Sequence, residues 1–151
     1  MIEQKRETDY DPFDLDEVGE VRENVSSLYS FEALEVYQKA RKYRKKIYEV
    51  AKKLPPEGKQ ILSPQMMDAA RSMTNNIAEG HGRFHFQETM QFFRIARGSA
   101  QEILDDLNIC LDEGYFEAVH IDELKKEGFE VVKSINGYIA YLRKRKQELS
   151  T

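Results

Sequence analysis

The amino-acid sequence predicts an all-α protein that folds as an antiparallel up-and-down four-helix bundle. Tryptophan is absent, only 4 prolines occur in 151 residues, and 33% of the residues are charged. Long segments place apolar residues at helical spacing, and short connections separate these segments. Long amphipathic helices with short connections favour antiparallel neighbours, and a chain of this length can bury one core. We therefore expect one helical domain over residues 31–149, preceded by an N-terminal extension over residues 1–30.

The predicted extension is acidic and poor in apolar residues. It contains nine acidic and three basic residues, a net charge of −6, which leaves the rest of the chain at +2. Phe13, Leu15, Val18 and Val21 are scattered among the charged residues. Such a composition is typical of a segment that is disordered or docks on another surface. Alternatively, the extension pairs with the basic helix that follows and covers it until a polyanion displaces it.

The first predicted helix spans residues 31–54, and Pro55 and Pro56 end it. Apolar residues recur at helical spacing and predict the side that faces the core. These residues are Ala33, Val36, Tyr37, Ala40, Tyr43, Ile47, Val50, Ala51 and Leu54. The same segment contains eight Lys or Arg but only three Glu, so its outer surface is basic.

The second predicted helix spans residues 64–79. Ser63 suits the N-cap and Pro64 the first helical position. The apolar side of this helix is narrow, so the backbone of a neighbouring helix can approach closely. Its members are Ala69, Ala70, Met73, Ile77 and Ala78. We expect Gly80 to end the helix in the left-handed conformation, followed by a turn that reverses the chain.

The third and fourth predicted helices span residues 86–113 and 121–149. Gly114 is expected to end the third helix. The residues expected to face the core from the third helix are Phe93, Ala96, Ala100, Ile103, Leu104, Leu107 and Leu111. Those expected to do so from the fourth are Leu124, Val131, Val132, Ile135, Ile139 and Leu142.

A motif joins the second and third helices: residues 65–83 read QMMDAARSMTNNIAEGHGR, and residues 98–102 read GSAQE. With its flanks, this pattern resembles the 23S rRNA-intervening sequence proteins, also called the four helix bundle protein family. The matching residues are Gln65, Ala69, Ala70, Ser72, Asn76, Ile77, Ala78, Glu79, Gly80, Gly82, Arg83, Ile95, Ala96, Gly98, Ser99 and Glu102. The resemblance covers about residues 31–147 and implies a compact bundle that assembles into a homo-oligomeric ring, often a pentamer, without enzymatic activity. Met67 and Asp68 depart from the pattern, which usually has two basic residues after the glutamine.

Two interpretations of the polar motif residues remain open. In the structural one, Glu79 and Arg83 form an ion pair across the turn, while Asn76 and Ser99 bridge the second and third helices through hydrogen bonds. Gly98 would then allow these two helices to approach closely. In the functional one, the polar motif residues form a ligand or partner site at the turn.

Nucleic-acid binding is the first functional hypothesis. Basic residues lie on the outside of the first helix and near the C-terminus, and such patches attract phosphate backbones. They are Arg41, Lys42, Arg44, Lys45, Lys46, Lys52, Lys53, Arg143, Lys144, Arg145 and Lys146. The resemblance implies RNA or a ribonucleoprotein as the partner, because relatives occur as insertions within rRNA genes. The accessory proteins of diversity-generating retroelements are similar, and they bind a reverse transcriptase and its RNA. In a ring, each weak patch would be repeated and would gain avidity.

The competing hypothesis is an oligomeric adaptor that binds another protein and no nucleic acid. The chain contains more aromatic residues than we expect one small bundle to bury, so some of them would line subunit contacts. The aromatic residues in question are Tyr29, Tyr48, Phe84, Phe92, Tyr115, Phe116, Tyr138 and Tyr141. Salt discriminates between the hypotheses, since phosphate contacts weaken steeply as salt rises and an aromatic interface changes little.

The sequence gives little support for catalysis, a cofactor or a metal site. The Glu-x-x-His spacing of carboxylate-bridged metal bundles occurs only at Glu117 and His120, in a predicted connection. His81 and His85 lie four residues apart, but His81 stands between two glycines, so the pair need not share a helical face. Cys110 lies in an apolar run and is expected to be a buried thiol. Without a long apolar segment or a basic-then-apolar leader, we expect a cytoplasmic protein that does not bind membranes.

Overall fold

The computed structural model describes residues 30–150, and no β-strand occurs among them. Its elements are η3 (Phe31–Ala33), α2 (Glu35–Lys52), α3 (Pro56–Lys59), α4 (Leu62–His81), α5 (Phe86–Asp112) and α6 (Ala118–Ser150). The all-α class is thus confirmed for the described part of the chain. Both expectations for the acidic extension, disorder or docking and an electrostatic cover, fall almost wholly on residues 1–29, outside the described residues.

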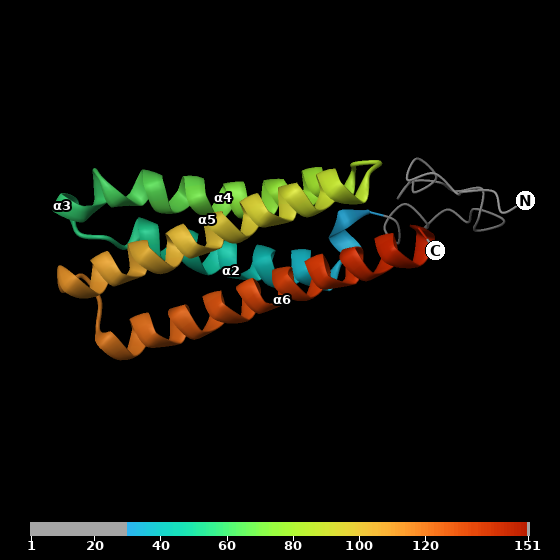
Figure 1. Cartoon of the computed structure of the whole chain (residues 1–151). Helices are drawn as coiled ribbons and strands as arrows, with labels where there is room; N and C mark the ends of the chain where they lie inside the picture. Colours follow the sequence, from blue (N-terminus) through green and yellow to red (C-terminus); the bar gives the residue numbers. More distant parts are fainter. Residues whose placement is uncertain (1–29, 151) are drawn as a thin grey trace, which may run out of the picture.

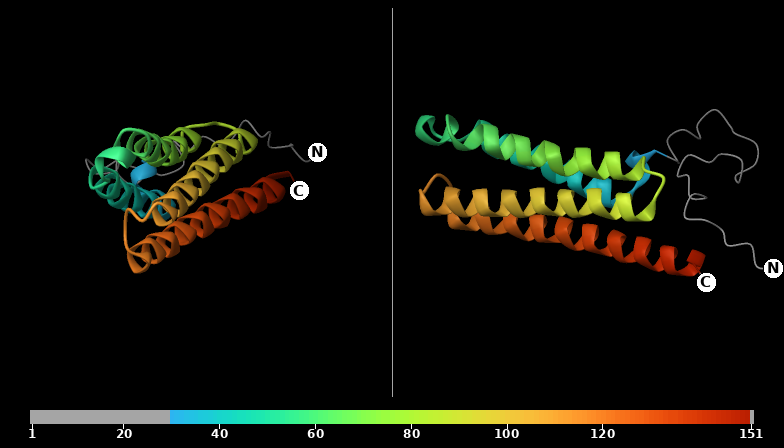
Figure 2. Two further views of the ribbon diagram at one scale, coloured as in Figure 1. Left: turned by 90° about the vertical axis from the view of Figure 1, so that its left-hand side faces the viewer. Right: turned by 45° about the horizontal axis from the view of Figure 1, so that its top comes forward.

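The four long helices lie side by side, and consecutive long helices run in opposite directions (Figure 1). Both α2 and α5 pack against α4 on one side and against α6 on the other. The helices α2 and α5 therefore occupy opposite corners of the arrangement (Figure 2). The C-terminal end of α6 lies at the same end of the molecule as η3 (Figure 1). This arrangement fixes which charged surfaces are neighbours and which are far apart.

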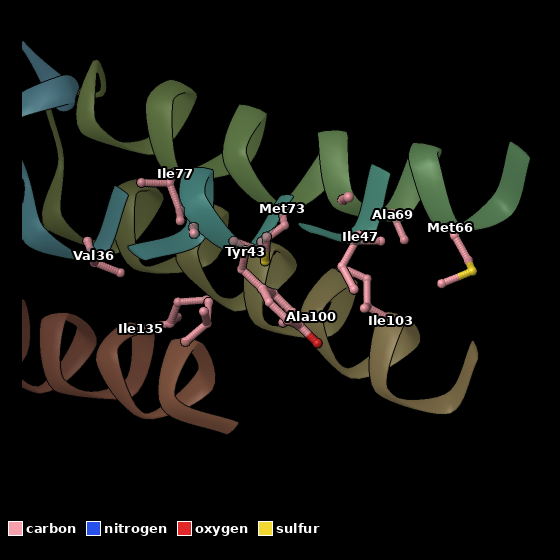
Figure 3. Close-up of a cluster of buried hydrophobic side chains, with 14 of the residues drawn as sticks. Val36, Tyr43, Ile47, Met66, Ala69, Met73, Ile77, Ala100, Ile103 and Ile135 are labelled. Carbon is pink, nitrogen blue, oxygen red and sulfur yellow. The ribbon is translucent and has the colours of Figure 1, made fainter. Parts of the chain in front are cut away.

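One apolar core joins the four long helices (Figure 3). Tyr43 and Ile47 from α2, Met73 from α4, Ile103 from α5 and Ile135 from α6 are all fully buried in it. Burial of each large apolar side chain contributes roughly 1.5–3 kcal/mol, so this core supplies the main driving force for folding. Four residues expected on the apolar sides of the helices depart from the prediction: Ala33 and Leu111 are exposed, and Ala78 and Val132 are only partly buried.

The first turns of the helices differ from the sequence prediction. Ser30 caps η3 by accepting a hydrogen bond from the backbone N–H of Glu32 at 2.9 Å, so α2 begins four residues later than expected. Helix α4 begins at Leu62 with Ile61 as N-cap, and Ser63 is a buried residue of its first turn rather than a cap. Pro64 is tolerated because N–H groups in the first helical turn have no intrahelical partner.

Two glycines expected to end helices behave differently. Gly80 does not end α4 and has no positive φ; it lies inside the helix, where an added Cβ would be 2.8 Å from Cβ of Phe92. The expectation for Gly80 was wrong because close packing of α5, rather than backbone conformation, requires the glycine there. Helix α4 continues to His81, with Gly82 as C-cap at φ −80°. Gly114 has φ +69° directly after α5, so the expected glycine end is confirmed at this position.

Most of the aromatic residues singled out in the sequence are partly buried within one chain. Five of them are only partly accessible: Tyr48, Phe92, Tyr115, Phe116 and Tyr138. None of these five is fully buried, and the expectation that some of the set line subunit contacts stays a prediction. Only Phe84 and Tyr141, 51% and 52% exposed, project into solvent, while Tyr29 lies outside the described residues.

Candidate functional site

The polar motif residues meet along the contact between α4 and α5, the most extensive helix contact in the molecule. The Ser99 hydroxyl donates to the Ser72 hydroxyl at 2.9 Å and joins the two helices. The Asn76 side-chain amide does not reach Ser99 as expected; it donates to the carbonyl and hydroxyl oxygens of Ser72, within its own helix, at 2.7 and 3.1 Å. Ser72 is therefore the bridging residue, and Asn76 orients it.

The end of α4 is held by a second group of motif residues. Arg83 forms the expected ion pair with Glu79, and its guanidinium carbon lies 4.7 Å from the centre of the Phe92 ring. Both charged side chains remain partly exposed, so the ion pair on its own contributes little to the stability of the fold. Its geometric effect is larger, because it attaches the turn after α4 to the first part of α5 at the point where Gly80 admits Phe92.

Three further motif residues face outward. Gln65 and Glu102 are exposed, and Gly98 is exposed with no heavy atom within 4 Å of the position of an added Cβ. The expectation that Gly98 lets α4 and α5 approach closely was therefore wrong within this chain. Its face of α5 is open in the described structure, so any close approach that requires this glycine must come from outside residues 30–150.

The basic residues of α2 fall into two groups. In the first group, side chains are engaged within the chain: Arg44 donates to Thr74 Oγ1 at 2.7 Å, and Lys46 pairs with Glu127 of α6 at 2.8 Å. Lys52 also lies 3.7 Å from Glu49 on its own helix. Thr74 is buried, so the Arg44 contact is the best anchored of the three.

In the second group, Arg41, Lys42, Lys45 and Lys53 are exposed and form no ion pair with the described part of the chain. Lys53 lines a hollow of about 250 Å³ between α2 and α6, whose other lining residues include three glutamates. The acidic lining lowers the positive potential on this side of α2. The unopposed positive charge of α2 is thus concentrated on Arg41, Lys42 and Lys45.

The C-terminal basic residues form a separate cluster at the end of α6. Arg143, Lys144 and Arg145 are exposed, while Lys146 donates to Gln87 Oε1 at 2.7 Å. Lys144 lies 17 residues beyond Glu127, the partner of Lys46, which is about 25 Å along the helix axis. The structure therefore does not bring the two predicted basic patches together.

Acidic side chains gather on α5 at the opposite corner from α2. Glu102 and Asp105 are exposed, but Asp106 is only 5% exposed, and its Oδ2 has no hydrogen-bond partner in the described part of the chain. Burial, with the charges of Glu102 and Asp105, raises the pKa of Asp106 to about 6. The folded chain thus binds this proton more tightly than the unfolded chain does. The ionised carboxylate lowers stability progressively as pH rises through the interval between about 4 and 6.

A second hollow, of about 570 Å³, lies between η3 and the end of α4 and is lined by Phe31, Asn75, Ala78, Glu79, Gly82 and Arg83. Glu79 and Arg83 already pair with each other there, so no free acid or base faces it from that pair. Within residues 30–150, no three His, Cys, Asp or Glu side chains lie close enough together to hold a metal ion. None of the helices described is both long and apolar enough to span a membrane.

Comparison of the sequence with models of known protein families identifies the family of this chain. A family model described as 23S rRNA-intervening sequence protein matches residues 32–137. The chain belongs to this family. A comparison with curated proteins found no match. Within this 23S rRNA-intervening sequence protein, the matched region includes the basic residues of α2 and the acidic residues of α5, whereas Arg143, Lys144 and Arg145 lie outside it.

Sequence reasoning did not single out Asp106 as buried or Thr74 as an anchor for Arg44. Whether these two side chains are buried can be determined only when the rotation of each helix about its axis is known. Asp106 follows Ile103 and precedes Cys110 at helical spacing, and this was the one signal that could have placed it near the core.

Proposed function

We propose that this 23S rRNA-intervening sequence protein is a non-catalytic homo-oligomeric scaffold that binds RNA or a ribonucleoprotein. The subunit is an up-and-down four-helix bundle, and the assembly is a ring, for which the family resemblance favours a pentamer. A reverse transcriptase with its RNA is one such ribonucleoprotein partner. The observation that carries the proposal is the exposed cluster Arg143, Lys144 and Arg145, three adjacent cations at one end of the molecule.

The α6 cluster lies away from the glutamates that offset part of the positive charge of α2. On α2, Lys46 is neutralised by Glu127, and the neighbouring hollow carries further glutamates. At the end of α6, the Glu148 carboxylate lies 4.0 Å from Arg145, at the limit of an ion pair. Arginine donates to two phosphate oxygens at once, so each of the two arginines can bind a phosphate. The three cations point in different directions around the helix and present positive charge over much of its end. A ring would repeat the cluster in every subunit and would raise affinity through multivalency.

The test is fluorescence anisotropy with labelled single-stranded polyuridine RNA, titrated with the full-length protein at several salt concentrations. We expect binding at low salt that weakens as salt rises, with a slope of roughly −0.7 per neutralised phosphate. The triple variant Arg143→Glu, Lys144→Glu and Arg145→Glu should lower the affinity at least tenfold and flatten the salt slope.

The matched control reverses three exposed lysines at the opposite end of the molecule, outside both basic surfaces under test: Lys53→Glu, Lys59→Glu and Lys126→Glu. It alters the net charge equally but leaves the α6 cluster intact. Equal losses in both triple variants would mean that only net charge matters and would overturn the site assignment. Absence of RNA binding by the unaltered protein would overturn the RNA proposal itself.

A protein adaptor that binds no nucleic acid is the alternative. It is favoured by apolar side chains that face solvent, among them Ile61, Val119 and Phe129. Isolated exposed apolar residues are common, so this observation is weaker than a cluster of three cations. Light scattering with absorbance at two wavelengths separates the two proposals. A pentamer of the 17.7 kDa chain, 88.5 kDa in total, would carry nucleic acid that high salt removes under the first proposal and none under the second.

A further inference from the structure

The outer face of α5 presents one continuous stripe of unusual composition. Ile95, Gly98, Glu102, Asp105 and Ile109 follow one another at spacings of three and four residues, so they share one side of the helix. All five are exposed, with Ile95 at 44% and Ile109 at 39%. Apolar residues at both ends with carboxylates and an open glycine between them form a surface that another helix can contact closely.

A second observation shows that this stripe lacks a partner among the described residues. Asp106 adjoins Glu102 and Asp105 and is nine-tenths buried, yet its Oδ2 has no hydrogen-bond partner within residues 30–150. Buried polar atoms are nearly always satisfied, so an unpaired carboxylate oxygen at the margin of a surface points to a donor from outside. The two exposed carboxylates nearby make that donor a cation.

The complementary surface lies on the same chain, at the opposite corner. Arg41, Lys45, Tyr48 and Lys52 also follow at spacings of three and four residues along the outer side of α2. Arg41 and Lys45 form no ion pair with the described residues. This stripe covers 12 residues, about 17 Å from first to last Cα, and the α5 stripe covers 15 residues, about 21 Å, so their lengths are similar.

We propose that the α5 stripe is a docking surface for the α2 stripe of a second copy of this chain. Arg41 and Lys45 of one copy face Glu102, Asp105 and Asp106 of the next, and Gly98 lets the helices come close between the two isoleucines. Because the two surfaces differ and lie on opposite corners, the contact is head-to-tail, and each copy uses both surfaces. Such a contact generates a ring when the rotation closes. The inference rests on the self-assembly in the proposed function and identifies its interface.

A polyanion is the wrong occupant for the α5 stripe, because its carboxylates would repel phosphates. With α2 engaged by the neighbouring copy, the α6 cluster stays free for RNA at the end of the molecule. Assembly and RNA binding therefore use different residues and can be tested separately.

The experiment is a charge exchange in the full-length protein, read as molar mass against concentration by light scattering. Glu102→Arg with Asp105→Arg should raise the dissociation midpoint at least tenfold, and Arg41→Glu with Lys45→Glu should do the same. All four substitutions in one chain place opposite charges against each other again in every interface. We expect this quadruple variant to recover at least part of the wild-type assembly.

The control for the α2 double uses the outer face of α6, where Lys126→Glu with Lys133→Glu changes net charge by the same amount and should leave assembly unchanged. Far-UV circular dichroism must show native helicity for every variant. A wild-type protein that is monomeric at all concentrations overturns both the interface and the assembly in the proposed function. An assembled wild type that is insensitive to both double reversals, or a quadruple variant no better than the doubles, overturns the interface alone.

Discussion

Tyr43 offers the sharpest test of the core, because its hydroxyl is buried without a hydrogen-bond partner in the described part of the chain. The residue is fully buried, and burial raises the pKa of its phenol, so the group stays neutral. An unsatisfied buried polar group costs roughly 1–3 kcal/mol. Replacing Tyr43 with Phe removes that cost and gives up only the contacts of one oxygen atom. We expect Tyr43→Phe to raise the free energy of unfolding by about 1 kcal/mol.

The position of the Tyr43 hydroxyl allows a second test, in which two substitutions are combined. It lies against Gly128 of α6, where an added Cβ would be 2.5 Å from the Tyr43 oxygen and 2.8 Å from Leu104 Cδ2. Gly128→Ala should therefore destabilise the protein by about 1–2 kcal/mol, an overpacking cost reduced by the better helix propensity of alanine. In the Tyr43→Phe background the nearest clash is gone. The double variant should be more stable than the two single effects predict, with a coupling energy of about 1 kcal/mol.

The assay is urea unfolding followed by circular dichroism, with all four proteins at one concentration because any assembly contributes to stability. A gain of about 1 kcal/mol corresponds to about 2–4 °C in thermal midpoint for a chain of this size. A loss of stability in Tyr43→Phe would mean that the hydroxyl has a partner. Additive effects in the double variant would mean that the hydroxyl does not face Gly128, and either result would refute the reasoning.

Three further outcomes follow from local geometry. Gly80→Ala should lower the free energy of unfolding by about 1–2 kcal/mol, because the added Cβ would lie 2.8 Å from Cβ of Phe92. Gly137→Ala, which has open space around it, should raise it by up to about 1 kcal/mol. Equal effects of the two substitutions in urea unfolding would contradict the packing role of Gly80. Gly114→Ala should cost about 1 kcal/mol because φ is +69°, and a neutral result would contradict this backbone conformation. Burial raises the pKa of the Cys110 thiol to about 11, so alkylation at pH 8 should require unfolding, and rapid labelling of folded protein would show an accessible thiolate.

The positions of the long helices were predictable because each has a regular apolar period and a clear stop. The inward residues expected at Tyr43, Ile47, Ile103 and Ile135 are all buried, and the glycine end of α5 at Gly114 is confirmed. Periodicity reports which side of a helix is apolar, and one shared core then fixes the rotation of each helix. This is why the fold class followed from the sequence.

The details of the motif did not follow, because one residue type serves several purposes. In the sequence, Gly80 is typical of a helix end. Only the distance between its added Cβ and Phe92 Cβ shows that α5 packs too closely to admit a side chain there. In the sequence, Gly98 is typical of a residue that lets two helices pack closely, yet it faces open space in the described structure. Asn76 and Ser99 both have hydrogen-bonding side chains, but the choice of Ser72 as the bridge depends on rotamers that spacing does not determine. The basic residues of α2 are visible in the sequence, but the ion pair of Lys46 with Glu127 of α6 depends on the tertiary arrangement.

Asp106 connects the stability of one chain to its assembly, and Asp106→Asn should affect the two in opposite directions. In dilute protein, the substitution removes an unpaired buried charge. A pKa raised from 3.8 to about 6 corresponds to a gain of at most about 3 kcal/mol at pH 7.5, falling to about 1 kcal/mol at pH 4.5, where the folded carboxyl is already protonated. In the proposed assembly, the same substitution removes the acceptor for a cation of the next copy, so light scattering on concentrated protein should show weaker association. A residue with only a structural role in its own chain would change the first measurement and leave the second unchanged.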